Sequence, residues 1–234
     1  MRRSRVYLGL SIISLAVAAL LSHVADGAHC RFESSDCFAD GDQAPADTAS
    51  GAREDLYDHA ISGRFDQAIQ IAQRLTARDA NDSWVALYHA YALRGDDRIE
   101  ESADRYTHAL QLAEQQENAR VAIDALTGRA ACRIASDDVS GADRDLTRAL
   151  EIATRAENTR RTDSSAYQLA CIHAQRAVVY TRIRSAGTSE FEKQRAVRWL
   201  KLARARGYDN MQHMRHDLDL GPLAGYSPYE SLFD

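Results

Sequence analysis

The chain has 234 residues, of which 45% are hydrophobic and 27% are charged, and its formal net charge is -5. These values are typical of a globular domain and argue against a disordered chain or a protein with many membrane spans. The acidic balance also argues against a nucleic-acid-binding protein, whose surface must attract phosphate. Only 3 Pro and 12 Gly occur, while Ala, Leu, Arg, Glu and Gln recur in long runs, a composition that favours helices.

The first 27 residues carry the pattern of an export signal. The basic start MRRSR precedes an uncharged apolar run at residues 6–21, and Ala25 and Gly27 then supply small residues at the positions a signal peptidase requires. We expect cleavage after Gly27. The alternative is a retained anchor in the inner membrane, because about 17 apolar residues are enough to span a bilayer. In both cases the arginines hold the start of the chain inside, so the remainder is expected in the periplasm or outside the cytoplasm.

Residues 28–52 are predicted to form a flexible linker. Residues 38–52 are small, polar and acidic and show no periodicity. Cys30 and Cys37 are separated by six residues, and in an oxidising compartment they are expected to form a local disulfide. The alternative is a pair of exposed thiols on a flexible leader.

From residue 53 onward, apolar residues recur at helical spacing, and no strand-like alternation competes with them. The clearest runs are Trp84, Leu87, Tyr88, Tyr91; Tyr106, Ala109, Leu110, Ala113; Leu146, Ala149, Leu150, Ala153; and Ala196, Trp199, Leu200, Ala203. Left-handed glycines are expected at Gly63, Gly95, Gly187 and Gly207, and a capping box is expected at Ser189 and Glu192. We therefore expect an all-α fold in residues 53–207, with eight helices paired into four antiparallel hairpins.

The second helices of these hairpins resemble one another. They align as Ala68, Ala72, Leu75; Ser102, Tyr106, Ala109; Ala142, Leu146, Ala149; and Ala196, Leu200, Ala203. The first two units lie 34 residues apart, which is the period of tetratricopeptide (TPR) repeats, and later spacings are 40 and 54. The stretch WVALYHAYALRGD at residues 84–96 resembles the first-helix signature of that family. A TPR-like α-solenoid is therefore predicted, and a different α-solenoid is the alternative.

The C-terminal third carries a second pattern. Its residues are Tyr167, Leu169, Ala170, Cys171, Gly207, His213, Asp217, Asp219, Leu220, Pro222 and Leu223. This pattern resembles the TPR end-of-group segment that closes bacterial TPR arrays often attached to serine/threonine kinases. This resemblance implies that residues 208–234 form a cap on the last hairpin, as terminal units of solenoids require. Because the chain has no kinase motif, the resemblance implies the helical module alone.

Residues that could support chemistry are few. His213 and His216, with Met211 and Met214 nearby, could bind a soft metal, but no third ligand cluster accompanies them and the family pattern accounts for His213 without metal. We therefore expect neither a metal nor a cofactor. A phosphate loop, a nucleophile elbow, an HExxH motif and paired CxxC motifs are all missing from the sequence, so we expect no enzymatic activity.

The function predicted from these patterns is an exported, non-enzymatic scaffold that binds a protein or peptide in its concave groove. The expected groove residues are Arg53, Tyr57, Asp82, Val85, His89, Arg129, Arg133 and Tyr167. Arg129 and Arg133 share one helix face, which would suit an extended peptide carrying carboxylates. The main alternative is a structural spacer of the cell envelope with no specific ligand; metal binding or enzymatic activity is the weaker one. Cys132 and Cys171 are expected to be buried free thiols.

Overall fold

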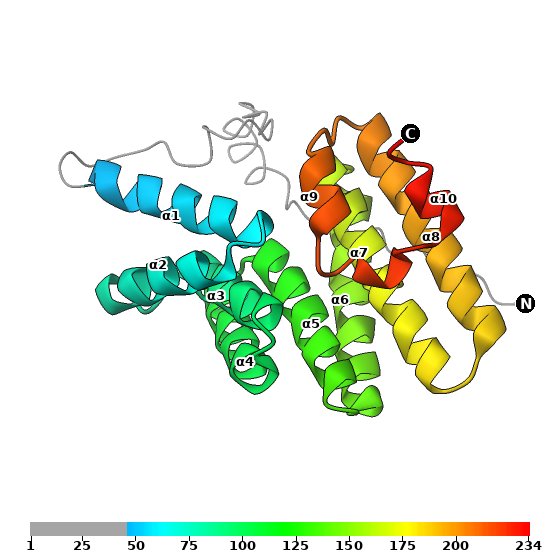
Figure 1. The fold of residues 1–234 in the computed structure, drawn as a ribbon, viewed down its shortest axis with the longest axis horizontal. Helices are drawn as coiled ribbons and strands as arrows, with labels where there is room; N and C mark the ends of the chain where they lie inside the picture. Colours follow the sequence, from blue (N-terminus) through cyan, green and yellow to red (C-terminus); the bar gives the residue numbers. More distant parts are fainter. Residues whose placement is uncertain (1–45) are drawn as a thin grey trace, which may run out of the picture. The chain divides into compact units, whose positions relative to one another are not determined.

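A computed structural model describes residues 46–234, and within this range every regular element is a helix (Figure 1). The eight long helices are α1 (Ala46–Ile61), α2 (Phe65–Arg78), α3 (Ser83–Gly95), α4 (Ile99–Gln115), α5 (Ala119–Ala135), α6 (Val139–Thr159), α7 (Asp163–Arg182) and α8 (Ala186–Ala205). Three short elements follow, namely α9 (Met211–His216), the 3-10 turn η1 (Gly221–Leu223) and α10 (Ser227–Glu230).

The long helices form four consecutive hairpins, and each hairpin packs on the next. The first helices of the hairpins, α1, α3, α5 and α7, also pack directly on one another, so they form one continuous layer, which we call the inner face. This arrangement confirms the expected all-α, solenoid-like fold of paired helices with a C-terminal cap. One boundary differs from expectation: α1 begins at Ala46, so residues 46–52, which were assigned to the linker, are helical.

The residues aligned as a repeat lie in the core. All twelve aligned positions in the second helices are buried. The structure changes the alignment of the last unit with the others. Ser189 is the fourth residue of α8, as Ser102 is the fourth residue of α4, so these two serines occupy equivalent positions. Ser102 Oγ donates to Ala90 O at 2.7 Å, and Ser189 Oγ donates to Ala177 O at 2.8 Å. Each serine therefore ties a second helix to a buried carbonyl of its own first helix.

The expected capping box at Ser189 and Glu192 is wrong. Helix α8 begins earlier, after Ser185, so Ser189 is already inside the helix. Glu192 instead places Oε2 at 2.5 Å from Nδ1 of His173 in the core of the last hairpin, where burial lowers the pKa of His173. The capping box that forms is at the start of α7, where Thr162 and Ser165 satisfy each other's backbone N–H groups.

The turns use glycine at only two of the four expected positions. Gly63 and Gly207 have φ values of 74° and 108°, so the left-handed prediction is confirmed there. It is wrong for Gly187, which lies inside α8, and for Gly95. Gly95 is needed for close packing, because an added Cβ would lie 2.3 Å from the Phe65 ring.

The C-terminal residues cover the last hairpin. Met214, Leu220 and Leu223 are fully buried, and they share a hydrophobic cluster with Tyr229 of α10 and with apolar residues of α7 and α8. Figure 1 shows α9 and the turn that follows it in front of α7. This short segment therefore closes the array over apolar surface that a further hairpin would otherwise cover.

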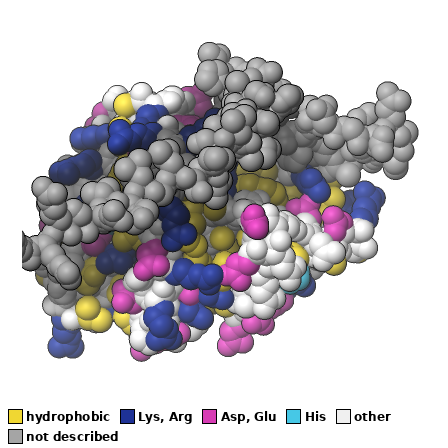
Figure 2. Space-filling model, turned by 180° about the vertical axis from the view of Figure 1, so that it is seen from behind, with side chains coloured by type: hydrophobic (Ala, Val, Ile, Leu, Met, Phe, Trp, Pro, Cys, Tyr) yellow, Lys and Arg dark blue, Asp and Glu magenta, His cyan; other side chains and the backbone are white. Residues whose placement is uncertain are grey.

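No helix within residues 46–234 combines the length and the apolar character that a membrane span requires. The expected signal or anchor at residues 1–27 and the expected Cys30–Cys37 disulfide lie outside the described residues. Cys132 and Cys171 are free and buried, as expected. On the face seen in Figure 2, acidic and basic side chains lie interspersed around hydrophobic ones.

Candidate protein-binding groove

A short turn from Asp217 to Leu220, here called the acidic segment, lies against the inner face, and Leu220 N closes it by donating to Asp217 O at 3.0 Å. Asp217 has extended backbone angles (φ -63°, ψ 121°) that end α9, and the chain then turns into η1, with Leu220 back in the right-handed helical region (φ -92°, ψ -5°). Tyr91 Oη of α3 accepts a hydrogen bond from Leu218 N at 3.1 Å, across 127 residues of sequence. Gln175 Nε2 of α7 donates to Asp219 O at 2.9 Å. Side chains of two inner helices therefore hold the main chain of this segment.

The carboxylates of the segment are held as well. Tyr167 Oη donates to Asp217 Oδ2 at 2.7 Å, and Asp217 Oδ1 accepts from Asp219 N at 2.9 Å. Arg94 Nη1 lies 2.7 Å from Asp219 Oδ1. Since both members of this ion pair are largely buried, with side-chain exposures of 7% and 14%, breaking it would leave an uncompensated charge inside the protein.

Arg94 is the central cation of this site. Its guanidinium lies 5.4 Å from the centre of the Tyr91 ring and 5.8 Å from that of Tyr106, so two aromatic faces add cation–π attraction. All three of its nitrogens are buried, and none has an acceptor in hydrogen-bond geometry among the described residues. The pair with Asp219 is therefore an ionic contact at 2.7 Å that leaves the donor capacity of the guanidinium unsatisfied.

Asp124 of α5 places a third carboxylate near the acidic segment. Burial raises its pKa to about 7; Arg120 and the hydrogen bond from Gln168 lower it, and Asp219 and Asp217 raise it. Gln168 Nε2 donates to Asp124 Oδ1 at 2.7 Å. Burial also raises the pKa of Asp219, against the opposing influence of Arg94. Negative charge is therefore concentrated here, with Arg94 opposite Asp219 and Arg120 lowering the pKa of Asp124.

Aromatic side chains continue the inner face from α3 and α1 to the cap. The ring centres of Trp84 and Tyr88 are 5.9 Å apart, and those of Tyr88 and Tyr57 are 5.3 Å apart. His213 of α9 follows at 6.5 Å from Tyr57 and at 5.5 Å from Tyr167. This row of half-buried and buried rings joins the first helix of the array to the cap.

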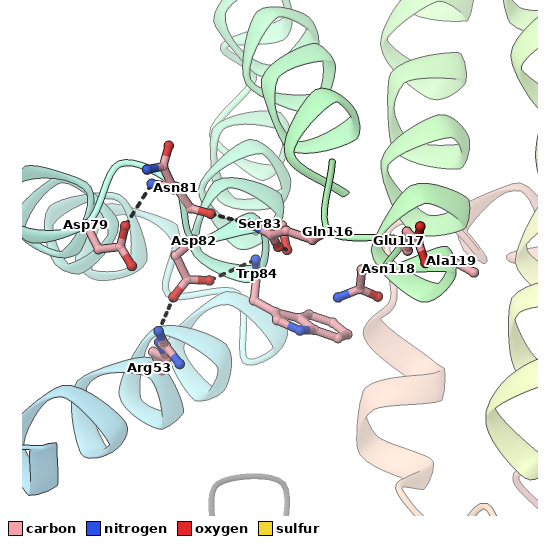
Figure 3. Close-up of a pocket in the computed structure, with 10 residues that line it drawn as sticks. All are labelled: Arg53, Asp79, Asn81, Asp82, Ser83, Trp84, Gln116, Glu117, Asn118 and Ala119. Atoms are coloured by element: carbon pink, nitrogen blue, oxygen red, sulfur yellow. Dashed lines mark hydrogen bonds and ion pairs between the residues drawn. The ribbon is translucent and has the colours of Figure 1, made fainter. Parts of the chain in front are cut away.

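An open pocket lies beside this row, at the edge where α3 and α5 begin (Figure 3). Its volume is about 640 Å³, and its lining comprises Arg53, Asp79, Asn81, Asp82, Ser83, Trp84, Gln116, Glu117, Asn118 and Ala119. Asp82 caps α3 by accepting from Trp84 N at 3.0 Å, and its other oxygen pairs with Arg53 at 2.5 Å. Most lining groups are polar, so the pocket offers hydrogen bonds to a polar or charged chain.

Three of the residues predicted to line the groove lie at this surface: Arg53 and Asp82 line the pocket, and Tyr57 belongs to the aromatic row. Three others are not on an open face, and that expectation is wrong for them. Val85 and His89 are each only 3% exposed, because their side of α3 packs into the array. Burial, followed by Arg105 and Arg98, lowers the pKa of His89 to about 4.

The third is Tyr167, which is 6% exposed because it is covered by the cap and bonded to Asp217. The basic groove expected from Arg129 and Arg133 is also wrong. Arg129 donates from Nε and Nη2 to the carboxylate of Asp145 on α6, at 2.9 and 2.8 Å. Arg133 Nη1 lies 2.8 Å from the same carboxylate, so both arginines neutralise a buried acid inside their own hairpin.

The two C-terminal histidines have ordinary protein partners. His213 Nδ1 is 2.6 Å from Tyr208 Oη, and Nε2 is 3.8 Å from Asp217, while His216 is exposed. Within residues 46–234 no three His, Cys, Asp or Glu side chains are grouped as a metal site would need. Cys171 Sγ lies 3.8 Å from Asp217 Oδ2, beneath the acidic segment.

Of the residues that hold the acidic segment, the sequence predicted only Tyr167 as a site residue and missed Arg94, Tyr91 and Gln175. Arg94 carried a usable signal, because it is the only Lys, Arg, Asp or Glu in the otherwise apolar helix α3. Asp124 is similarly the one acidic residue of α5. Tyr91 was recognised only as part of a repeat signature, and Gln175 had no signal at all.

Comparisons with known proteins add no assignment. No protein-family model matches the chain, and no curated protein matches it.

Proposed function

We propose that the protein is an exported, non-enzymatic scaffold of TPR type that binds a peptide segment of a protein partner on its inner face. The observation that carries the proposal is the way in which the inner face holds a non-helical segment by both its main chain and its carboxylates. Tyr91 and Gln175 bind main-chain groups of the acidic segment, while Tyr167 and Arg94 bind its carboxylates. Side chains so arranged suit recognition of a peptide segment by its main chain and its carboxylates.

The open pocket gives a partner a place to enter. It continues from the aromatic row at Trp84 to the beginning of α5, and its polar lining supplies hydrogen-bond donors and acceptors. Tyrosine, tryptophan and arginine are also the residues enriched where protein interfaces hold their binding energy. Export rests on the leader-like residues 1–27, which place this surface in the periplasm with or without an inner-membrane anchor.

A selection from a random peptide display library on the full chain tests this proposal. The best peptide is then titrated against the wild type, against Glu117→Lys in the pocket, and against Glu151→Lys on α6. Both glutamates are exposed, so the two variants make the same charge change at different places. We expect Glu117→Lys to change the affinity by about tenfold, equivalent to about 1.4 kcal/mol, and Glu151→Lys to leave it unchanged.

Equal effects of the two substitutions would place binding away from the pocket and contradict the proposal. A selection that enriches no peptide above scrambled sequences would favour the alternative function, an envelope spacer with no specific ligand.

A further inference from the structure

We propose that the acidic segment is an internal competitor for the inner face, and that the partner presents an exposed Asp-x-Asp-Leu stretch that replaces it. This inference rests on the proposed peptide-binding function and names both the partner class and the regulation of that site. The segment reads Asp217, Leu218, Asp219, Leu220. It occupies the inner face as a turn closed by hydrogen bonds from Leu220 N and Asp219 N to Asp217, a conformation that a partner's peptide would have to adopt there.

Each position of the segment is read by a different part of the inner face. Asp217 takes a hydrogen bond from Tyr167, and Asp219 pairs with Arg94. Leu220 is 1% exposed in the cluster beneath the cap, whereas Leu218 is only half-buried. Two acids and a terminal leucine are therefore selected, and the residue between the acids is selected mainly through its backbone N–H. These contacts define Asp-x-Asp-Leu as the recognised pattern.

The acidic segment does not satisfy the hydrogen-bond donors that Arg94 offers on the inner face. Arg94 can donate in a bidentate manner to one carboxylate, but none of its three nitrogens meets an acceptor in hydrogen-bond geometry among the described residues, and Asp219 Oδ1 has no donor there either, although it lies 2.7 Å from Nη1. Buried donors without acceptors weaken the bound state. A peptide free to move can turn its carboxylate onto two of these nitrogens, so it can form contacts that the tethered segment lacks.

The rest of the cap has attachments that do not involve the two acids. Tyr229 Oη donates to Met214 O at 2.7 Å, and Arg204 Nη1 of α8 donates to Leu232 O at 2.7 Å. Met214 and Leu223 are fully buried against the last hairpin. Release of residues 217–220 from the inner face therefore leaves these other attachments of the cap in place. A segment held by its own chain acts at a high effective concentration, of order millimolar, and suppresses binding in trans until it is weakened.

The test uses a fluorescein-labelled peptide with the sequence of residues 215–224, titrated against the full chain by fluorescence anisotropy. The variant whose acidic segment binds the inner face more weakly, here called the plug-weakened chain, is Asp217→Asn/Asp219→Asn. Arg94 and Tyr167 are unchanged in it. The matched control is Asp209→Asn/Asp234→Asn, which removes the same charge from two exposed acids of the cap. We expect the plug-weakened chain to bind the peptide at least about tenfold more tightly than the wild type or the control.

Two further measurements assign the gain to this site. Adding Arg94→Gln to the plug-weakened chain should abolish the gain, and a peptide with both aspartates replaced by asparagine should not bind. Circular dichroism shows whether each variant is folded; if the double variant is not, Asp219→Asn alone carries the test, because it keeps the contacts of Asp217.

A folded plug-weakened chain with no gain in affinity overturns the proposal and makes the segment a structural cap only. Dimerisation of that chain without peptide binding also overturns it, because the occupant would then be a second copy. The display selection can fail although the plug-weakened chain binds the labelled peptide more tightly than the wild type. That result would refute the open pocket as the entry site, but the acidic segment would still compete for the inner face.

Discussion

Gly128 allows the second and third hairpins to approach each other, and its replacement by alanine sets two effects of known size against each other. An added Cβ would lie 2.2 Å from Cζ and 2.5 Å from Oη of Tyr106, whose ring is 1% exposed and has no free space to move into. Alanine in place of glycine within a helix stabilises by about 1 kcal/mol. Overpacking of a filled core destabilises by about 1–3 kcal/mol, and a contact this short belongs at the upper end of that range. We therefore expect Gly128→Ala to lower the free energy of unfolding by about 1–2 kcal/mol.

Thermal unfolding followed by far-ultraviolet circular dichroism measures this change, with Gly187→Ala as the control. Gly187 also lies in a helix, but an added Cβ there would meet nothing within 4 Å, so only the helix-favouring effect remains. The melting temperature should fall by about 2–8 °C for Gly128→Ala and should stay level or rise for Gly187→Ala. Adding Tyr106→Leu to Gly128→Ala should make the loss less than additive, since the clashing ring is removed. A Gly128→Ala protein that melts at or above the wild-type temperature would refute this reasoning.

Three further predictions concern the cap and two buried titratable groups. Deletion of the residues after Gly207 should destabilise the last hairpin by several kcal/mol, at about 25 cal/mol per Å² of apolar surface uncovered, whereas replacing His213 and His216 together with Asn should do much less; equal melting temperatures for the deletion and the wild type would contradict the cap. The pKa of His89 is lowered to about 4, so the stability due to its neutral form is full above pH 6.5 and is lost as the pH falls toward 4. Urea unfolding measures this loss between pH 6.5 and pH 4. The free energy of unfolding should fall less over this range for His89→Gln than for the wild type, by at most on the order of 3 kcal/mol, and an equal fall in both proteins would contradict the assignment. The pKa of Asp124 is raised to about 7, so its ionisation opposes folding at higher pH; Asp124→Asn should raise the free energy of unfolding at pH 8 but not at pH 4, and the same change at both values would contradict it.

The helical fold could be predicted from the sequence because its signals are local. Apolar residues at helical spacing decide which residues are helical, and the small and large positions around Ala142 and Leu146 decide which face packs. Those positions are buried in the structure, and the eight helices and the C-terminal cap were expected. The register of the last unit was missed because α8 is long enough to offer two similar alignments, and only the hydrogen bond from Ser189 distinguishes them.

The groove could not be predicted in the same way, because its residues are brought together by packing across the whole array. The periodicity places Arg129 and Arg133 on one helix face, but only the tertiary structure shows that Asp145 lies opposite them. Arg94 and Asp219 are far apart in sequence, and neither predicts the other. The sequence by itself thus determined the helices, their pairing and the presence of a cap, since these follow from short-range patterns. Only the tertiary structure decided that the acidic segment lies on the inner face, because that contact depends on how four hairpins stack.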